Sequence, residues 1–167
     1  VRIMPALFSG ELVADDSKPE KPWAYLKVDK GIPQSAYNAL QAVGVPCQPR
    51  FDNPHITVIQ NDEAKELVDT YGDGWKEAVE GGPDSYVFTM SEMVDVDPIG
   101  WDEMERVWFI RVDCPELQAK RTMLGLTPLP TSEDGQELQF HITVGVRPKN
   151  DIDESDARRM ILRTLLD

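Results

Sequence analysis

Both histidines of this chain stand in the same four-residue motif. His55-Ile56-Thr57-Val58 and His141-Ile142-Thr143-Val144 are identical, and the 167 residues hold no other histidine. Imidazole has an ordinary pKa of about 6.5 and can hold either protonation state at neutral pH. One histidine can therefore accept a proton while the other donates one, which is what phosphodiester cleavage needs. The sequence does not assign the acid and the base.

The threonines add a second function to each motif. Alternate residues of a strand share a face, so Thr57 projects beside His55 and Thr143 beside His141. We expect the two hydroxyls to bind the non-bridging phosphate oxygens as charge develops on them. A single His-x-Thr is also typical of a half-exposed surface strand, but two identical tetrads that use every histidine favour the catalytic interpretation.

The chemistry that these residues indicate needs no metal ion. Cys47 and Cys114 lie far apart in the sequence and neither belongs to a metal-type pair. No run of carboxylates and histidines resembles the ligands of a two-metal nuclease. We therefore expect no metal and no cofactor, and two reduced thiols, as in a cytosolic protein.

The elements that must position the tetrads form a repeat. Tyr25-Leu26-Lys27-Val28-Asp29 resembles Phe109-Ile110-Arg111-Val112-Asp113, and each segment precedes a helix opened by a proline (Pro33 and Pro115) and then a tetrad. The repeat predicts an α+β fold with two pseudo-symmetric strand–helix–strand lobes and a central cleft. Two copies are too few for a solenoid.

The repeat also predicts what surrounds the histidines. The same alternation sets one face of each flanking strand opposite the residues that enter the core. This polar face carries Tyr25 and Lys27 in the first unit, and Phe109 and Arg111 in the second. Two such faces meeting across a cleft would form a symmetric phosphate pocket. Lys27 and Arg111 are the candidate phosphate-binding cations, although both could also be solvated edge residues.

The remaining segments complete a single bilobed domain over residues 1–167. Residues 1–21 are expected to form an N-terminal arm or extended lead-in, and residues 147–167 a C-terminal helix or lid. Further helices are expected at residues 33–42, 61–72 and 115–123, and strands at residues 24–28, 55–59, 86–96, 107–112 and 140–146.

Charge limits the partners. The net charge is −13 and the isoelectric point is about 4.5. Long nucleic acids are held mainly by many Lys and Arg contacts to phosphates, so we expect none as a partner. A phosphate-bearing substrate must therefore be small or must enter a locally basic pocket. No apolar run is long enough to span a bilayer, and we expect a cytoplasmic protein without a membrane partner. The oligomeric state is not indicated.

The paired His-Ile-Thr-Val motifs resemble the signature of the 2H phosphoesterase superfamily. The segments around them resemble its phage-encoded anti-CBASS branch, the anti-CBASS protein 1 family. These segments are Lys21–Val28, Asp52–Val58, Gly100–Ile110 and Phe140–Val144.

The resemblance implies a metal-independent phosphodiesterase that destroys cyclic di- and trinucleotide messengers such as cGAMP, so that a phage evades CBASS defence from the host cytoplasm. It implies that His55 and His141 form the acid–base pair and that Thr57 and Thr143 bind phosphate. Stacking of nucleobases is carried over to Tyr25 and Trp101. Trp23, Trp75 and Trp108 are instead expected to pack in the core or between the lobes.

Two alternatives remain open at this stage. One is a cellular 2′,3′-cyclic phosphodiesterase that acts on RNA ends or small cyclic nucleotides. The other is a non-catalytic sponge that sequesters a cyclic nucleotide. A C-terminal lid closes over the ligand in the anti-CBASS branch, whereas residues 147–167 contain no aromatic residue.

Overall fold

The strands build one strongly curled antiparallel sheet. The computed structural model describes residues 6–98, 101–131, 135 and 137–149. The strands are β1 (Phe8–Gly10), β2 (Leu12–Asp15), β3 (Trp23–Lys27), β4 (Gln48–Pro49), β5 (His55–Ile59), β6 (Tyr86–Val96), β7 (Met104–Asp113) and β8 (His141–Pro148). Over the described residues they form an eight-stranded sheet in the order β1-β6-β7-β8-β5-β3-β2, with β4 paired to β8 beside this path.

The order of the strands shows the predicted two-fold repeat. The tetrad strands β5 and β8 pair at the centre of the sheet. Outward from them, β3 and β2 repeat the arrangement of β7 and β6. The expected α+β fold with two strand–helix–strand units is therefore confirmed. The two units join edge to edge in one sheet, so both tetrads lie on one curved face.

The helices follow the strands as the sequence predicts. They are α1 (Gly31–Ala42), α2 (Asn61–Tyr71), the short 3-10 helix η1 (Gly72–Gly74), α3 (Trp75–Glu80) and α4 (Pro115–Met123). Pro33 lies in the first turn of α1 and Pro115 opens α4, where a missing N–H costs nothing. Gly44, with φ of +80°, follows the end of α1.

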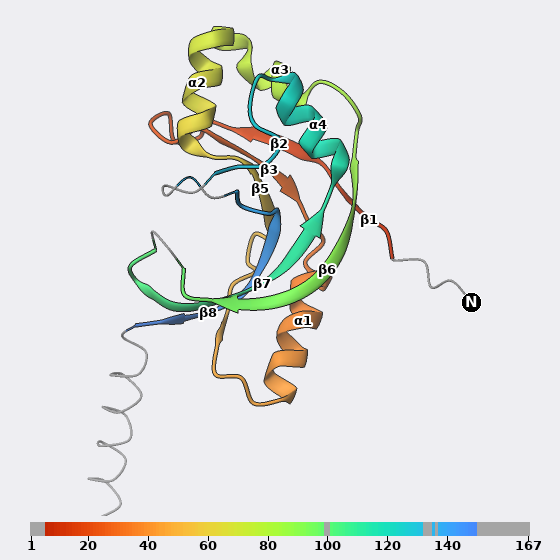
Figure 1. Ribbon diagram of the computed structural model, residues 1–167, viewed down its shortest axis with the longest axis vertical. Coiled ribbons are helices and arrows are strands. Elements are labelled where there is room, and N and C mark those ends of the chain that lie inside the picture. The colour runs from red at the N-terminus through yellow and green to blue at the C-terminus, as the bar shows by residue number, and fades with distance from the viewer. Residues whose placement is uncertain (1–5, 99–100, 132–134, 136, 150–167) are drawn as a thin grey trace, which may run out of the picture.

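The helices pack on the apolar face of the sheet. Ile56, Val58, Ile142 and Val144 have no exposed surface and join the main core cluster. Helix α1 packs on β8 and α4 on β6, while α2 packs on β3 and α3 on β2. Figure 1 shows α2, α3 and α4 around one end of the curled sheet and α1 at the other.

Three features differ from the sequence expectations or fall outside them. Residues 8–15, expected as an arm or lead-in, form β1 and β2, because Leu12 and Ala14 alternate with more exposed neighbours and enter the core. Strand β4 and helix α3 were not expected. The predicted C-terminal helix or lid lies outside the described residues from residue 150 onward.

No helix in the described part of the chain is long and apolar enough to cross a membrane.

Candidate active site

The central strand pair brings the two tetrads together. Ile56 and Ile142 are register partners in the antiparallel β5–β8 pair. Continuing this register by one residue on each side sets His55 opposite Thr143, and Thr57 opposite His141. The histidines are then diagonal neighbours, whose spacing across an antiparallel pair is about 7–8 Å. That spacing leaves room for a phosphate between two imidazoles and two hydroxyls.

The flanking strands repeat the same pattern on both sides of this square. The register partners are Tyr25 with Thr57, Lys27 with His55, Phe109 with Thr143, and Arg111 with His141. Each tetrad therefore has one ring and one cation beside it on the same face. The alternation rule predicted this arrangement for all four flanking residues.

A backbone carbonyl orients each imidazole. Nδ1 of His55 lies 2.7 Å from the carbonyl oxygen of Asn53, and Nδ1 of His141 lies 3.0 Å from that of Gln139. A carbonyl oxygen only accepts hydrogen bonds, so Nδ1 donates in both rings. Nε2 is then the nitrogen that gains or loses a proton in each histidine.

The two imidazoles have different surroundings. The ring of Phe109 lies 4.7 Å from that of His141, whereas His55 meets Trp23 edge to face at 5.0 Å and Tyr25 at 5.8 Å. Burial lowers the pKa of His141, and the nearby charge of His55 lowers it further, against a raising effect of the Gln139 carbonyl. His141 is thus set up to be neutral at neutral pH.

A cleft of about 1420 Å³ opens beside the tetrads. The predicted site residues that line it are Thr57, Trp101, Arg111, His141 and Thr143. His55, Tyr25 and Lys27 are not among the lining residues. His55 and Tyr25 adjoin the cleft through Trp23, which lines it and contacts both rings. Lys27 is exposed.

The cleft wall carries more anions than cations. The charged lining residues besides His141 are Asp15, Asp62, Glu63, Glu66, Asp97, Glu137, Lys18, Lys21 and Arg111. Arg111 adjoins the second tetrad, and its guanidinium lies 3.4 Å from the carboxylate of Glu92 in a partly exposed ion pair. A phosphate that binds Arg111 must compete with this carboxylate.

Trp23 was expected to pack in the core or between the lobes, but it lines the cleft and is only half-buried. Its ring lies 4.6 Å from that of Tyr25. The signal was present in the sequence, because Trp23 stands two residues before Tyr25 and therefore shares its face. Trp75 and Trp108 are 4% and 8% exposed and belong to the core, as expected.

Trp101 forms another aromatic part of the cleft wall. The guanidinium of Arg50 lies 5.4 Å from the centre of its ring, within the range of a cation–π contact. Arg50 follows β4 in a loop, and nothing in the sequence pattern pointed to it. The preceding Gly100 lies outside the described residues.

Possible metal ligands are not clustered in the part of the chain that the structure describes. Among the described residues, no group of three or more His, Cys, Asp or Glu side chains is placed to hold a metal ion. Cys47 and Cys114 are both free, and burial raises the pKa of each thiol.

Comparison with known families gives a match over most of the chain. The model of the family described as "Swiss Army Knife, 2H phosphoesterase domain" matches residues 24–152, which include both tetrads and most of the sheet. No curated protein and no solved structure matches the chain. The match covers more than half of the chain and agrees with the paired tetrads on the central strands. This chain therefore belongs to the 2H phosphoesterases, a family whose domain indicates hydrolysis of phosphodiester bonds.

Proposed function

We propose that this protein opens the 3′–5′ phosphodiester bonds of small cyclic oligonucleotides without a metal ion. The observation that carries the proposal is the β5–β8 register, which sets two imidazoles and two hydroxyls around one point on the sheet. This point borders a cleft whose wall includes the rings of Trp23 and Trp101.

The surroundings of the two histidines support different roles. His141, whose pKa is lowered, is the general base that takes the proton of the substrate's 2′-hydroxyl at Nε2. The 2′-oxygen attacks phosphorus, the bond to the 5′-oxygen breaks, and His55 donates a proton to that leaving oxygen. Thr57 and Thr143 hold the non-bridging oxygens. The product is a 2′,3′-cyclic phosphate.

Hydrolysis of this cyclic phosphate follows with the two roles exchanged. His55, now neutral, takes a proton from water, and His141, now protonated, returns its proton to the leaving 2′-oxygen. The pair thus ends in its starting protonation states. Apart from the attacking water, the cycle needs no external acid, base or ion.

Size and charge support a small, base-bearing substrate. A volume of about 1420 Å³ exceeds the roughly 300–1,000 Å³ of ordinary ligand pockets and leaves room for more than one nucleotide. A cyclic dinucleotide carries only about two negative charges, so few cations suffice. Stacking on a ring contributes about 1–3 kcal/mol per base, which suits a cleft that is otherwise acidic. In a phage, such an enzyme would remove CBASS messengers from the host cytoplasm.

Chromatography of products tests the proposal. The protein is incubated in EDTA with cyclic di- and trinucleotides and, in parallel, with an RNA that ends in a 2′,3′-cyclic phosphate. We expect linear products from the cyclic oligonucleotides, and none with His55→Ala or His141→Ala, which should fold normally because both rings lie on a solvent-facing surface.

Each alternative gives a distinct result. Preferred cleavage of the RNA end would indicate an RNA-end phosphodiesterase. Recovery of intact ligand after denaturation of the complex would indicate a sponge. Near-normal turnover by either histidine variant would refute the paired mechanism.

A further inference from the structure

Each tetrad ends in a β-bulge. In the β3–β5 pair, Tyr25 faces Thr57 and Ala24 faces Ile59, so Val58 is an extra residue without a partner on β3. In the β7–β8 pair, Phe109 faces Thr143 and Trp108 faces Gly145, which leaves Val144 in the same situation. A bulge bends its strand and changes the direction of neighbouring side chains. Both bulges directly follow the tetrad threonine.

The two bulge carbonyls are satisfied in different ways. A buried carbonyl without a hydrogen bond is costly, so each needs a donor. The Val144 carbonyl accepts from the backbone N–H of Arg50 at 3.0 Å. The Val58 carbonyl accepts from the side chain of Arg121, on α4, at 2.6 Å. One half of the site therefore depends on a side chain where the other uses the backbone.

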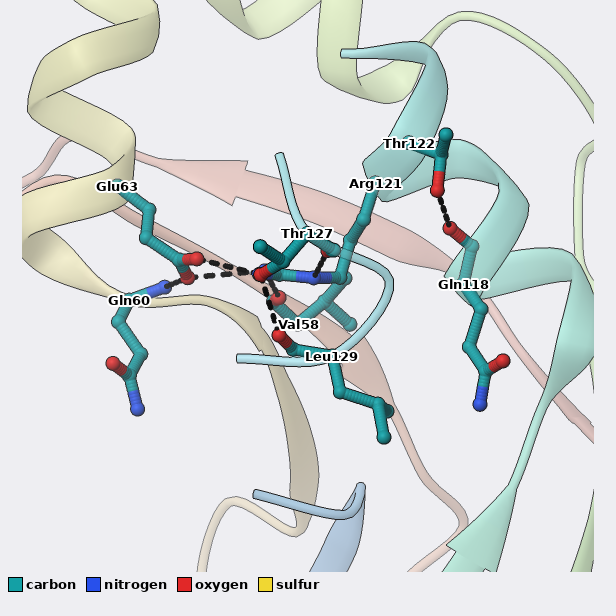
Figure 2. A network of polar contacts seen from close by, with 8 residues as sticks. All are labelled: Val58, Gln60, Glu63, Gln118, Arg121, Thr122, Thr127 and Leu129. Atoms are coloured by element: carbon teal, nitrogen blue, oxygen red, sulfur yellow. Dashed lines mark hydrogen bonds and ion pairs between the residues drawn. The ribbon is translucent and has the colours of Figure 1, made fainter. Parts of the chain in front are cut away.

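Arg121 makes several further contacts from a fully buried position. Its side chain has no exposed surface. The guanidinium forms a two-point ion pair with Glu63, at 3.0 and 2.5 Å, and Nε donates to the Thr127 carbonyl at 2.8 Å. Figure 2 shows the guanidinium between Glu63 on one side and Thr127 on the other, with the Val58 carbonyl beside it.

The partner of Arg121 on α2, Glu63, belongs to the cleft wall. Glu63 is the third residue of α2 and forms a capping box with Gln60, whose backbone N–H donates to the Glu63 carboxylate at 3.1 Å. Gln60 and Glu63 both line the cleft. Arg121 therefore fixes the first turn of α2 against the end of β5.

Another partner of Arg121, Thr127, begins a series of hydrogen bonds that ends beside the His141 tetrad. The Thr127 hydroxyl donates to the Leu129 carbonyl at 2.7 Å, and the Leu138 N–H donates to the Pro130 carbonyl at 2.7 Å. Leu138 precedes Gln139, whose carbonyl orients His141. One buried cation is thus connected to both halves of the site.

We propose that Arg121 is a positioning residue that holds the Val58 bulge and so directs the Thr57 hydroxyl at the substrate phosphate. The proposal rests on the phosphodiesterase function proposed above. The planar guanidinium can serve Val58, Glu63 and Thr127 at once, which a lysine ammonium with its different geometry cannot. Small displacements of a positioned group reduce rates strongly, by up to about 100-fold for 1 Å.

A double-mutant cycle with Arg121→Lys and Thr57→Val tests this proposal. We expect Arg121→Lys alone to lower kcat by about 10- to 100-fold with little change in KM. In the Thr57→Val background, where no hydroxyl remains to be directed, Arg121→Lys should cost little more. Lys120→Met is the matched control, because Lys120 is the neighbouring buried cation of α4 and donates to the Gly81 carbonyl, away from the cleft. It should leave kcat unchanged.

The opposite results would overturn the proposal. Arg121 does not act through Thr57 if Arg121→Lys leaves kcat unchanged. The same conclusion holds if the double variant lowers kcat by the product of the two single reductions. If Arg121→Lys fails to fold, the double variant Arg121→Met with Glu63→Met replaces the ion pair by apolar side chains, a change that folded proteins often tolerate. Its kcat should fall as well, and a normal kcat would refute the proposal.

One measurement does not depend on activity. Amide hydrogen exchange in residues 55–60 should be faster in Arg121→Lys, and unchanged in Lys120→Met, because only the first loses the contact to Val58. Unchanged exchange in Arg121→Lys would overturn the positioning role. Faster exchange in a protein that cleaves no cyclic oligonucleotide would refute the proposed function and leave the structural role of Arg121 intact.

Discussion

Replacing Trp23 by alanine should weaken substrate binding without damaging the fold. The indole is half-buried, lines the cleft and lies tilted against the ring of Tyr25, with 4.6 Å between ring centres. A base that stacks on such a ring gains about 1–3 kcal/mol. At about 1.4 kcal/mol per factor of ten, Trp23→Ala should raise the dissociation constant about 5- to 150-fold. Trp23→Phe keeps an aromatic face and should recover most of the affinity.

Binding is best measured where the substrate cannot be consumed. Titration calorimetry with a cyclic dinucleotide in the His141→Ala background gives the dissociation constant directly, whereas KM also contains rate constants. Trp75→Phe is the control, because Trp75 is 4% exposed in the core and should change stability but not affinity. Unchanged affinity in Trp23→Ala would refute the stacking role and return Trp23 to simple packing.

Four further predictions concern the histidines, the ion pair beside them and the absence of a metal requirement. His141 acts as a base only when neutral and its pKa lies below the ordinary 6.5, so kcat/KM should stay high until the pH falls below 6.5. Phe109→Ala admits water to His141 and should therefore move the loss of kcat/KM at low pH to a higher pH. Between pH 6.5 and the lower pKa of folded His141, this histidine is protonated in the unfolded chain but neutral in the folded protein. The free energy of unfolding measured in urea should therefore decrease as the pH falls through this interval. Glu92→Gln should lower KM by at most about 5-fold, because exposed ion pairs contribute about 0.2–1 kcal/mol, whereas Arg111→Gln should raise it. Addition of EDTA should leave the rate unchanged, and a loss that Mg²⁺ restores would contradict the two-histidine mechanism.

The alternation of residues along strands predicted which side chains share a face with the two histidines. It placed each histidine with its threonine, and it placed the flanking ring and cation of both halves on the same face as the tetrad. The internal repeat predicted two like units, and the structure contains them as β3-α1-β5 and β7-α4-β8. These predictions succeeded because they depend only on local geometry and on the requirement that one face of the sheet be buried.

The features that escaped prediction depend on pairing between distant segments. The bulges at Val58 and Val144 exist only as mismatches between two strands, and the sequence of one strand does not show them. Arg121 is buried beside a residue 63 positions away, although its place in an amphipathic helix resembles that of any solvated arginine. The aromatic contact of Arg50 with Trp101 likewise joins two loops.

Pseudo-symmetry explains how one motif can supply both an acid and a base. The two tetrads have the same sequence and equivalent register partners, so their backbone geometry alone does not distinguish an acid from a base. The difference comes from the aromatic residues beside each imidazole, which are not the same in the two halves. The half-buried imidazole of His141 lies beside the ring of Phe109, while that of His55 meets Trp23 and Tyr25 at the edge of the cleft. The repeat therefore places the two groups around the phosphorus, and burial lowers the pKa of His141, the proposed base.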